Sequence, residues 1–281
     1  MDILFNSKFL NHNPGSYAEG PYRIEDFVSK TRDVDRNGEE LITLVHSEAH
    51  LELVRKACMN HQVLAEVYLS PESFDAACSA VGLAVMAAEQ GDFAVVRPPG
   101  HHAKPERADG FCLFNNIAIA TQKLVNDGKK VFILDIDGHH GDGTQGIFYH
   151  TDRVLYCSMH QQFTYPWTGE VHETGAGNGK GFNMNFPLPA GSGDRELLEA
   201  VDKAIERAKK FKPDVVGVSA GFDGYKDDRL LELKYTLDGY YQCGKRLGRT
   251  FDHIFALLEG GYHLDIAKCA EHFIRGVDQK A

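Results

Sequence analysis

The histidine and carboxylate residues of this chain are concentrated in a few glycine-rich loops. The segment at residues 135–140 reads DIDGHH, and strand-like alternation would place Asp135, Asp137 and His139 on one side of it. Carboxylate oxygen and neutral imidazole are common ligands of a divalent transition metal, and a catalytic zinc needs three protein ligands and one open position. Asp223, in a second glycine-containing loop, is the best candidate to complete such a set. The pattern therefore predicts a metal site that joins these two loops.

Two tandem histidines, His101 and His102, lie in a further loop. On their own, adjacent loop histidines are more often polar surface residues than catalytic groups. Here two carboxylates, Asp135 and Asp142, remain once the metal has its ligands, and a carboxylate behind each imidazole would fix its tautomer and raise its basicity. We therefore interpret the four residues as acid–base dyads. Tyr262 follows two glycines, which suggests a hydroxyl directed toward substrate that could stabilise a developing oxyanion.

The elements that position these loops are predicted to be buried strands alternating with helices. Apolar runs precede the loops, and stretches with helical periodicity lie between them. The runs cover residues 93–96, 131–134, 154–157, 215–218 and 254–258, and the helices cover 73–89, 115–125, 194–209, with Asp194 as N-cap, and 236–247. This alternation predicts an α/β fold with a parallel sheet covered on both faces. Ligands bind at the carboxyl ends of parallel strands, so we expect the five loops to converge on one site. Residues 11–23 lack periodicity and are predicted to form a loop at its rim.

The composition limits the classes of protein that need to be considered. The 281 residues fit one large domain, 1–281, without a linker. The formal net charge of -10 argues against direct nucleic-acid binding and favours cationic partners. No apolar run is long enough to span a membrane and no signal peptide is visible, so a cytoplasmic protein is predicted. The six cysteines form no C-x-x-C pair, which indicates reduced thiols rather than disulfides or a sulfur-ligated zinc.

Five motifs together resemble the histone deacetylase superfamily, in its class II and bacterial or archaeal branch. They occur in the family's order: RPPGHHA at 97–103, GFCLFNN at 110–116, DIDGHHGDGT at 135–144, SAGFD at 219–223 and EGGY at 259–262. The resemblance implies the arginase-deacetylase fold, a single domain with a central, mostly parallel sheet of about eight strands flanked by helices. It also implies one zinc ion per chain.

The resemblance assigns a role to each motif position. It places the zinc ligands at Asp137, His139 and Asp223, the dyads at His101 with Asp135 and His102 with Asp142, the general base and acid at His102, and the transition-state hydroxyl at Tyr262. The walls of an acyl-lysine tunnel fall on Phe111 and Tyr165, with Gly110 and Gly260 beside them as substrate-binding positions. A structural potassium ion is expected near Asp135, Asp137, His139 and Ser158.

Three positions depart from the family's pattern. Trp167 stands where glycine is usual, Arg229 stands where most members have proline, and Leu230 stands where a polyamine-selective member carries a glutamate. The first departure could reshape the mouth of the tunnel. The third offers no partner to a second ammonium group, which favours an acetyl-lysine substrate over an acetylated polyamine.

The sequence thus predicts a zinc-dependent deacetylase that hydrolyses an acetylated lysine or a related acetylated amine. One alternative is an acetylpolyamine amidohydrolase or another small-amide hydrolase with the same site. Another is a catalytically silent acyl-lysine binding module, which would usually lack a ligand, a histidine or the tyrosine. An arginase-like site with two metals would need further carboxylates where the tandem histidines stand. The native metal, the acyl length and the oligomeric state stay open, because iron or cobalt could use the same ligands.

Overall fold

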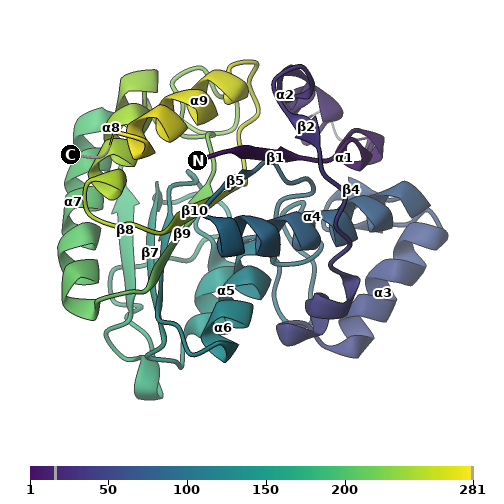
Figure 1. Ribbon diagram of the computed structural model, residues 1–281, viewed down its shortest axis with the longest axis horizontal. Helices are drawn as coiled ribbons and strands as arrows, with labels where there is room; N and C mark the ends of the chain where they lie inside the picture. Colours follow the sequence, from purple (N-terminus) through teal and green to yellow (C-terminus); the bar gives the residue numbers. More distant parts are fainter. Residues whose placement is uncertain (16–17, 280–281) are drawn as a thin grey trace.

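A parallel β-sheet forms the centre of the molecule (Figure 1). The computed structural model describes residues 1–15 and 18–279. The strands of the sheet are β1 (Ile3–Phe5), β2 (Arg32–Asp33), β5 (Phe93–Ala94), β6 (Val131–Asp135), β7 (Val154–Gln161), β8 (Asn183–Leu188), β9 (Val215–Ala220) and β10 (Ile254–Leu258). Their order is β2-β1-β5-β10-β9-β6-β7-β8, and all neighbours are parallel. The predicted parallel sheet of eight strands is confirmed. A separate antiparallel pair is formed by β3 (Val63–Leu64) and β4 (Val67–Tyr68).

Helices cover both faces of the sheet. The α-helices are α1 (Lys8–Asn11), α2 (Glu25–Val28), α3 (Glu48–Met59), α4 (Pro71–Gln90), α5 (Asn116–Asn126), α6 (Asp142–Phe148), α7 (Asp194–Phe211), α8 (Leu237–Gly248) and α9 (Ile266–Val277), and the 3-10 helices are η1 (Pro21–Arg23), η2 (Glu39–Leu44) and η3 (Gly177–Gly179). Figure 1 shows α7, α8 and α9 on one side of the strands and α4 and α5 on the other. Within the described part of the chain, no helix has the length and apolar character that crossing a membrane requires.

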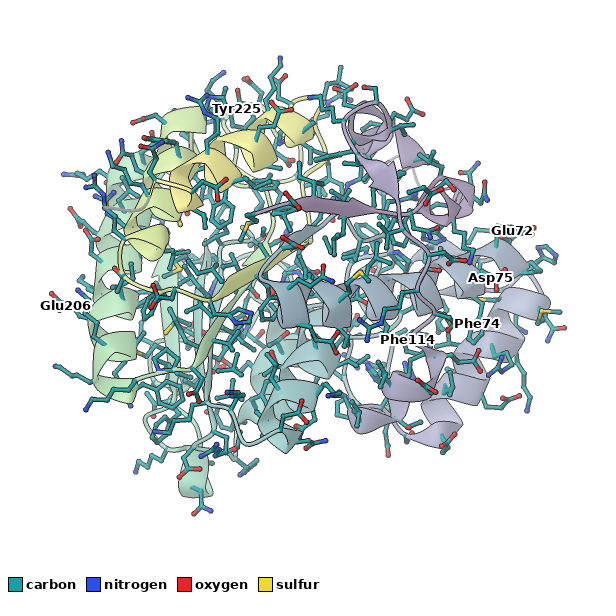
Figure 2. All side chains as sticks on the ribbon, viewed as in Figure 1. Glu72, Phe74, Asp75, Phe114, Glu206 and Tyr225 are labelled. Carbon is teal, nitrogen blue, oxygen red and sulfur yellow. The ribbon has the colours of Figure 1, made fainter. Side chains whose placement is uncertain are left out.

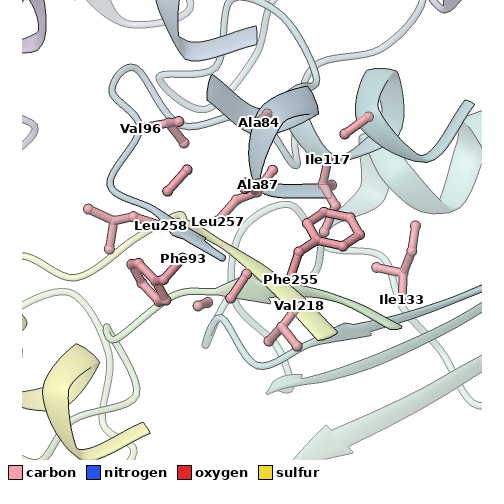
Figure 3. Close-up of a cluster of buried hydrophobic side chains, with 14 of the residues drawn as sticks. Ala84, Ala87, Phe93, Val96, Ile117, Ile133, Val218, Phe255, Leu257 and Leu258 are labelled. Atoms are coloured by element: carbon pink, nitrogen blue, oxygen red, sulfur yellow. The ribbon is translucent and has the colours of Figure 1, made fainter. Parts of the chain in front are cut away.

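The central strands are apolar because helices cover them on both sides. Every residue of β6, β7, β9 and β10 is buried, so these strands appear in the sequence as nearly continuous apolar runs. Figure 3 shows Ala84 and Ala87 of α4 and Ile117 of α5 gathered near Phe255 of β10. Phe255 pairs in register with Gly217 of β9, where a Cβ would lie 2.7 Å from the Phe255 ring. The small residue makes room for the ring.

The long helices direct their polar side chains outward. Figure 2 shows Glu206 of α7 at the outer surface, and Glu72 at the start of α4 is also exposed. The opposite face of α7 is apolar and buried, as expected for an amphipathic helix on a sheet. The apolar phase of residues 73–89 that predicted a helix corresponds to α4.

The start of α7 differs from the prediction. Asp194 is the first residue of the helix, and the N-cap is Gly193, so the prediction of Asp194 as N-cap is wrong. The carboxylate of Asp194 instead accepts hydrogen bonds from the backbone N–H of Thr236 at 2.8 Å and from its hydroxyl at 2.6 Å. Thr236 is in turn the N-cap of α8. One aspartate therefore links the first turns of two neighbouring helices, which explains why it is not available as a cap.

Candidate active site

Five loops at the carboxyl edge of the sheet line one cavity of about 260 Å³. The lining residues are His102, Gly110 and Phe111 after β5, His139 after β6, Thr164 and Tyr165 after β7, Leu230 after β9, and Tyr262 after β10. The predicted convergence of these loops is confirmed. The order of the strands explains it, because β5, β10, β9, β6 and β7 are consecutive neighbours in the sheet.

Two carboxylates and an imidazole meet at the base of these loops. Asp137, His139 and Asp223 each offer one ligand atom, and these atoms lie within 4.8 Å of one another. Backbone N–H groups orient both carboxylates: Gly138 donates to Asp223 at 2.6 Å, and Gly260 donates to Asp137 at 2.7 Å. The donor set suits a divalent transition metal, and His139 also lines the cavity, so an ion at this place would face it.

The two glycines predicted to contact substrate occupy different places. Gly110 lines the cavity with a φ of +51°, and a Cβ there would lie 2.6 Å from Cδ2 of His102. Gly260 lies beside the carboxylates of the candidate metal ligands, where a Cβ would stand 2.6 Å from Asp137 Oδ2 and 2.8 Å from Asp223 Oδ2. The structure thus places Gly260 as a hydrogen-bond donor to the Asp137 carboxylate, outside the cavity lining.

Each of the tandem histidines contacts a different carboxylate. His101 Nδ1 lies 3.1 Å from Asp135 Oδ2, and His102 Nδ1 lies 2.9 Å from Asp142 Oδ1. Burial and the positive charge of His101 lower the pKa of His102 to about 4. Burial also opposes the charge of His101, but the nearby carboxylates of Asp137 and Asp135 outweigh it and raise the pKa of His101 well above its usual range. The neutral imidazole in the cavity wall is therefore that of His102.

Glu259 fixes the position of the histidine loop, a role that the sequence did not reveal. Its carboxylate accepts hydrogen bonds from the backbone N–H of Gly100 at 2.7 Å and of His101 at 3.1 Å. Burial raises the pKa of Glu259 to about 7. The residue directly follows β10 and belongs to the EGGY motif, so an acid at the end of a buried strand was the available signal.

Lys104 is a second residue that supports the candidate active site and was not identified from the sequence. Its Nζ lies 2.6 Å from Asp142 and 3.1 Å from Asp109. Asp109 also accepts a hydrogen bond of 2.8 Å from the hydroxyl of Tyr165, whose ring centroid lies 5.1 Å from that of His102. One ammonium group therefore connects the carboxylate behind His102 with an aromatic wall of the cavity.

Tyr262 is held between an arginine and an aromatic ring. The Arg23 guanidinium carbon lies 4.9 Å from the centroid of the Tyr262 ring, and the ring of Phe111 lies 5.9 Å away. Arg23 also donates to the carbonyl of Gly261 at 2.6 Å and to that of Glu259 at 2.5 Å, which fixes the glycine loop before the tyrosine. Burial raises the pKa of Tyr262, so its hydroxyl stays protonated and can donate a hydrogen bond.

An exposed apolar side chain contributes to the lining of the cavity. Leu230, in the lining, is 45% exposed. Trp167, which follows the lining residue Tyr165 by two positions, is 75% exposed and does not line the cavity. Residues 11–23, predicted as a rim loop, include η1 (Pro21–Arg23), while positions 16–17 lie outside the described residues. From this segment, Arg23 reaches the site at Tyr262.

Comparisons with known proteins agree with this arrangement. The model of the histone deacetylase domain family matches residues 21–277. A probable deacetylase of Archaeoglobus fulgidus is 42% identical over 94% of this chain and 81% of its own length. The crystal structure of the HDA15 HD domain matches with a TM-score of 0.93 and 31% identity, over 100% of this chain and 88% of that one. Acetylpolyamine aminohydrolase from Burkholderia pseudomallei matches with a TM-score of 0.89 and 29% identity, over 99% of both chains. The chain belongs to the histone deacetylase family, as its motifs predicted, and the family's deacetylases support a hydrolase activity.

Proposed function

We propose that this protein is a zinc-dependent deacetylase that hydrolyses the amide of an acetylated lysine. The observation that carries the proposal is that the His102–Asp142 dyad, the Asp137–His139–Asp223 group and Tyr262 meet at one cavity. Each group has a distinct chemical use in amide hydrolysis, so their juxtaposition is difficult to explain by packing alone.

The ligand group fits zinc by the chemistry of its donors. Asp137, His139 and Asp223 would hold the ion, and a catalytic zinc site of three protein ligands leaves a position for water or substrate. When bound, zinc supplies Lewis acidity that polarises a carbonyl and makes water more acidic. A structural potassium ion near Asp135 and Ser158, which are paired in register on β6 and β7, stays a prediction.

His102 is the group that moves protons. Its Nδ1 contacts Asp142, so Nε2 is the nitrogen left for the reacting groups, and its lowered pKa keeps it able to accept a proton. We infer that His102 takes a proton from the attacking water and later donates one to the leaving amine. His101, bonded to Asp135 and adjacent to His102, serves as an electrostatic partner.

Tyr262 stabilises the negative charge that develops on the carbonyl oxygen. Its protonated hydroxyl belongs to a ring held by Arg23 and Phe111, so the donor is positioned before the reaction begins. Phe111 and Tyr165 line the same cavity and would enclose the methylene stem of the substrate and exclude water around the amide.

The substrate is proposed from the apolar character of the cavity. Leu230 offers no charge to a second ammonium group, which favours acetyl-lysine over an acetylated polyamine. The polyamine alternative is supported by the structural match to acetylpolyamine aminohydrolase. We further propose one catalytic domain over residues 1–281, and a cytoplasmic location stays a prediction from the sequence.

The deciding measurement compares kcat/KM for an acetyl-lysine peptide with those for acetylspermidine and acetylputrescine, after loading with a defined amount of zinc. We expect the peptide to be the better substrate. A tenfold advantage of either polyamine would overturn the choice of substrate, and hydrolysis of none of the three would contradict the enzymatic proposal. H102A should bind a hydroxamate inhibitor without hydrolysing the peptide, because it retains the proposed metal ligands and lacks the base.

A further inference from the structure

A second cavity lies beside the candidate active site. It has a volume of about 350 Å³ and is lined by Tyr22, Arg229, Tyr262, His263 and Leu264. Tyr262 lines both cavities, and the consecutive residues Arg229 and Leu230 line one cavity each. The two cavities are therefore adjacent, and a ligand whose acylated amine occupies the first lies beside the second.

Arg229 gives the second cavity a positive charge. Among the described residues that line it, Arg229 carries the only permanent positive charge, and its guanidinium forms no ion pair or hydrogen bond with the described part of the chain. The other basic group, His263, is occupied: Nε2 lies 2.9 Å from the carbonyl oxygen of Phe222, and Nδ1 accepts a bond of 3.1 Å from the backbone of Asp265. Burial lowers the pKa of His263, so this imidazole is neutral.

The neighbouring acids do not neutralise the guanidinium by contact. The carboxylate of Asp228 accepts hydrogen bonds from the backbone N–H of Leu230 at 2.8 Å and of Tyr262 at 2.7 Å. Asp227 forms an ion pair of 2.5 Å with Lys226. The two acids that directly precede Arg229 in the sequence therefore have other partners. A free guanidinium at the wall of a cavity, in a chain of net charge -10, is available to an external anion.

Apolar surface surrounds this charge. In the lining of the second cavity, Leu264 is 75% exposed and Tyr22 adds an aromatic ring, and Leu230, which is next to Arg229 in the chain and lines the first cavity, is 45% exposed. Exposed apolar side chains beside a cavity favour a ligand with an apolar stem. Because the planar guanidinium presents two parallel N–H donors, it suits a carboxylate better than a single acceptor atom. The combination matches a short aliphatic chain that ends in a carboxylate.

We propose that this cavity is a carboxylate-binding subsite in which Arg229 holds a carboxylate of the substrate whose acylated amine lies in the first cavity. The inference rests on the proposed deacetylase function and deepens it, because it selects anionic acylated amines over polyamines. The carboxylate belongs either to an acidic residue beside the acetyl-lysine of a peptide or to the α-carboxylate of acetyl-lysine itself. Both sources place a negative charge a few bonds from the acylated side chain.

The test uses substrate pairs that differ only in charge. One pair is an acetyl-lysine peptide with aspartate or asparagine at the following position, and the other is free Nε-acetyl-lysine and its α-amide. We expect the metal-loaded protein to prefer the charged member of at least one pair roughly tenfold in kcat/KM, as one charge-assisted contact would give. The pair that shows the preference identifies the source of the carboxylate. Equal rates within both pairs would overturn the subsite.

Variants separate this site from the general charge of the protein. In R229A the ratio of kcat/KM for the charged substrate to kcat/KM for the neutral one should fall to about one. In R229E the neutral substrate should become the better one. The control is R249A, because Arg249 is exposed at the end of α8, before the amino end of β10, and so lies on the opposite edge of the sheet. Its ratio should equal that of the unmodified protein. The proposal would be overturned if R229A kept the preference for the charged substrate, or if R249A lost that preference as fully as R229A.

Binding measurements keep the subsite testable if the proposed function fails. H102A retains Arg229 and every residue that lines the second cavity, so calorimetry can compare its binding of the aspartate and asparagine peptides. We expect tighter binding of the aspartate peptide, and loss of the difference in H102A combined with R229A. If the unmodified protein hydrolyses neither peptide but H102A still binds the aspartate peptide more tightly, only the enzymatic proposal is contradicted. If H102A binds the two peptides equally, the subsite is contradicted.

Discussion

Lys104 Nζ lies 2.6 Å from Oδ2 of Asp142, the carboxylate oxygen that is not bonded to His102. The other oxygen of Asp142 contacts His102 Nδ1 at 2.9 Å. A lysine and a histidine thus share one carboxylate, and the ammonium group partly offsets the negative charge that His102 experiences. The pKa of Asp142 falls to about 2, because the bonds from His102 and Lys104 outweigh burial. The proton affinity of His102, the proposed base, therefore depends on Lys104.

Replacing Lys104 with methionine should shift the acidic limb of the pH–rate profile to higher pH. Loss of the ammonium group leaves Asp142 fully available to His102, which raises the pKa of His102. The base works only when deprotonated, so kcat/KM should fall roughly threefold or more at the acidic end of the profile and recover toward neutral pH. K104R should behave like the unmodified protein. If the acidic limb of the pH–rate profile lies at the same pH in K104M as in the unmodified protein, Lys104 has only a structural role.

Removal of Asp223 should remove the metal. D223A lacks one of three donors held within 4.8 Å, so zinc binding and hydrolysis should both be lost. Metal content after dialysis, measured by mass spectrometry, gives the first readout, and circular dichroism establishes that the variant is folded. D223N keeps the volume of the side chain and should show the same loss.

D227A is the matched control for Asp223, because Asp227 is exposed and paired only with Lys226 in the described structure. It should retain one equivalent of metal and normal activity. Tight binding of one equivalent by both Asp223 variants would remove Asp223 from the ligand set.

Tyr262 should affect the transition state more than substrate binding. Y262F removes only the hydroxyl and leaves the ring between Arg23 and Phe111, so kcat should fall by roughly 100-fold or more with little change in KM. Steady-state kinetics with the acetyl-lysine peptide measures both constants. Y241F, which removes a tyrosine hydroxyl on α8, is the control. Near-normal kcat in Y262F would place the hydroxyl outside the chemistry.

Part of the candidate site could be predicted, because the candidate metal ligands and Tyr262 lie within a few positions of the ends of buried strands. β6, β9 and β10 are covered on both faces, so each is an apolar run that the sequence shows directly. β1 and β2 have three and two residues, which is too short to display a period, and β8 contains partly buried positions and a proline. These strands lie at or next to the edges of the sheet, where the pattern is weakest.

The supporting charges could not be predicted in the same way. Lys104, Arg23 and Glu19 resemble surface residues in the sequence, because charged side chains are usually exposed. Their roles depend on partners that are distant in the chain: Glu19 contacts Arg97 across 78 positions, and Lys104, which follows β5, contacts Asp142, which follows β6. Spacing along the chain carries no signal for such pairs, and only the folded sheet brings them together.

Glu19 should contribute strongly to stability through a buried ion cluster. Its carboxylate contacts Arg97 at 2.5 and 2.9 Å and Arg23 at 3.0 Å, and the side chains of all three residues are buried. E19Q leaves two buried guanidinium groups without a countercharge, so the free energy of unfolding should fall by about 3 to 5 kcal/mol. Because Arg23 also positions Tyr262, kcat should decrease as well. Urea unfolding at neutral pH measures the first effect, and E206Q, at an exposed position of α7, is the control.

The effect of E19Q should depend on pH in a defined direction. Burial would raise the pKa of Glu19, but the charge of Arg97 outweighs it and holds the pKa well below its ordinary range. A depressed pKa in the folded state gives stability that is fully present above the unfolded pKa, about 4.3, and is lost as the pH falls toward the folded pKa. The difference in unfolding free energy between the unmodified protein and E19Q should therefore be largest near pH 7 and shrink below about pH 4. A difference that is independent of pH, or as small as that of E206Q, would show that the carboxylate does not stabilise this cluster by its charge.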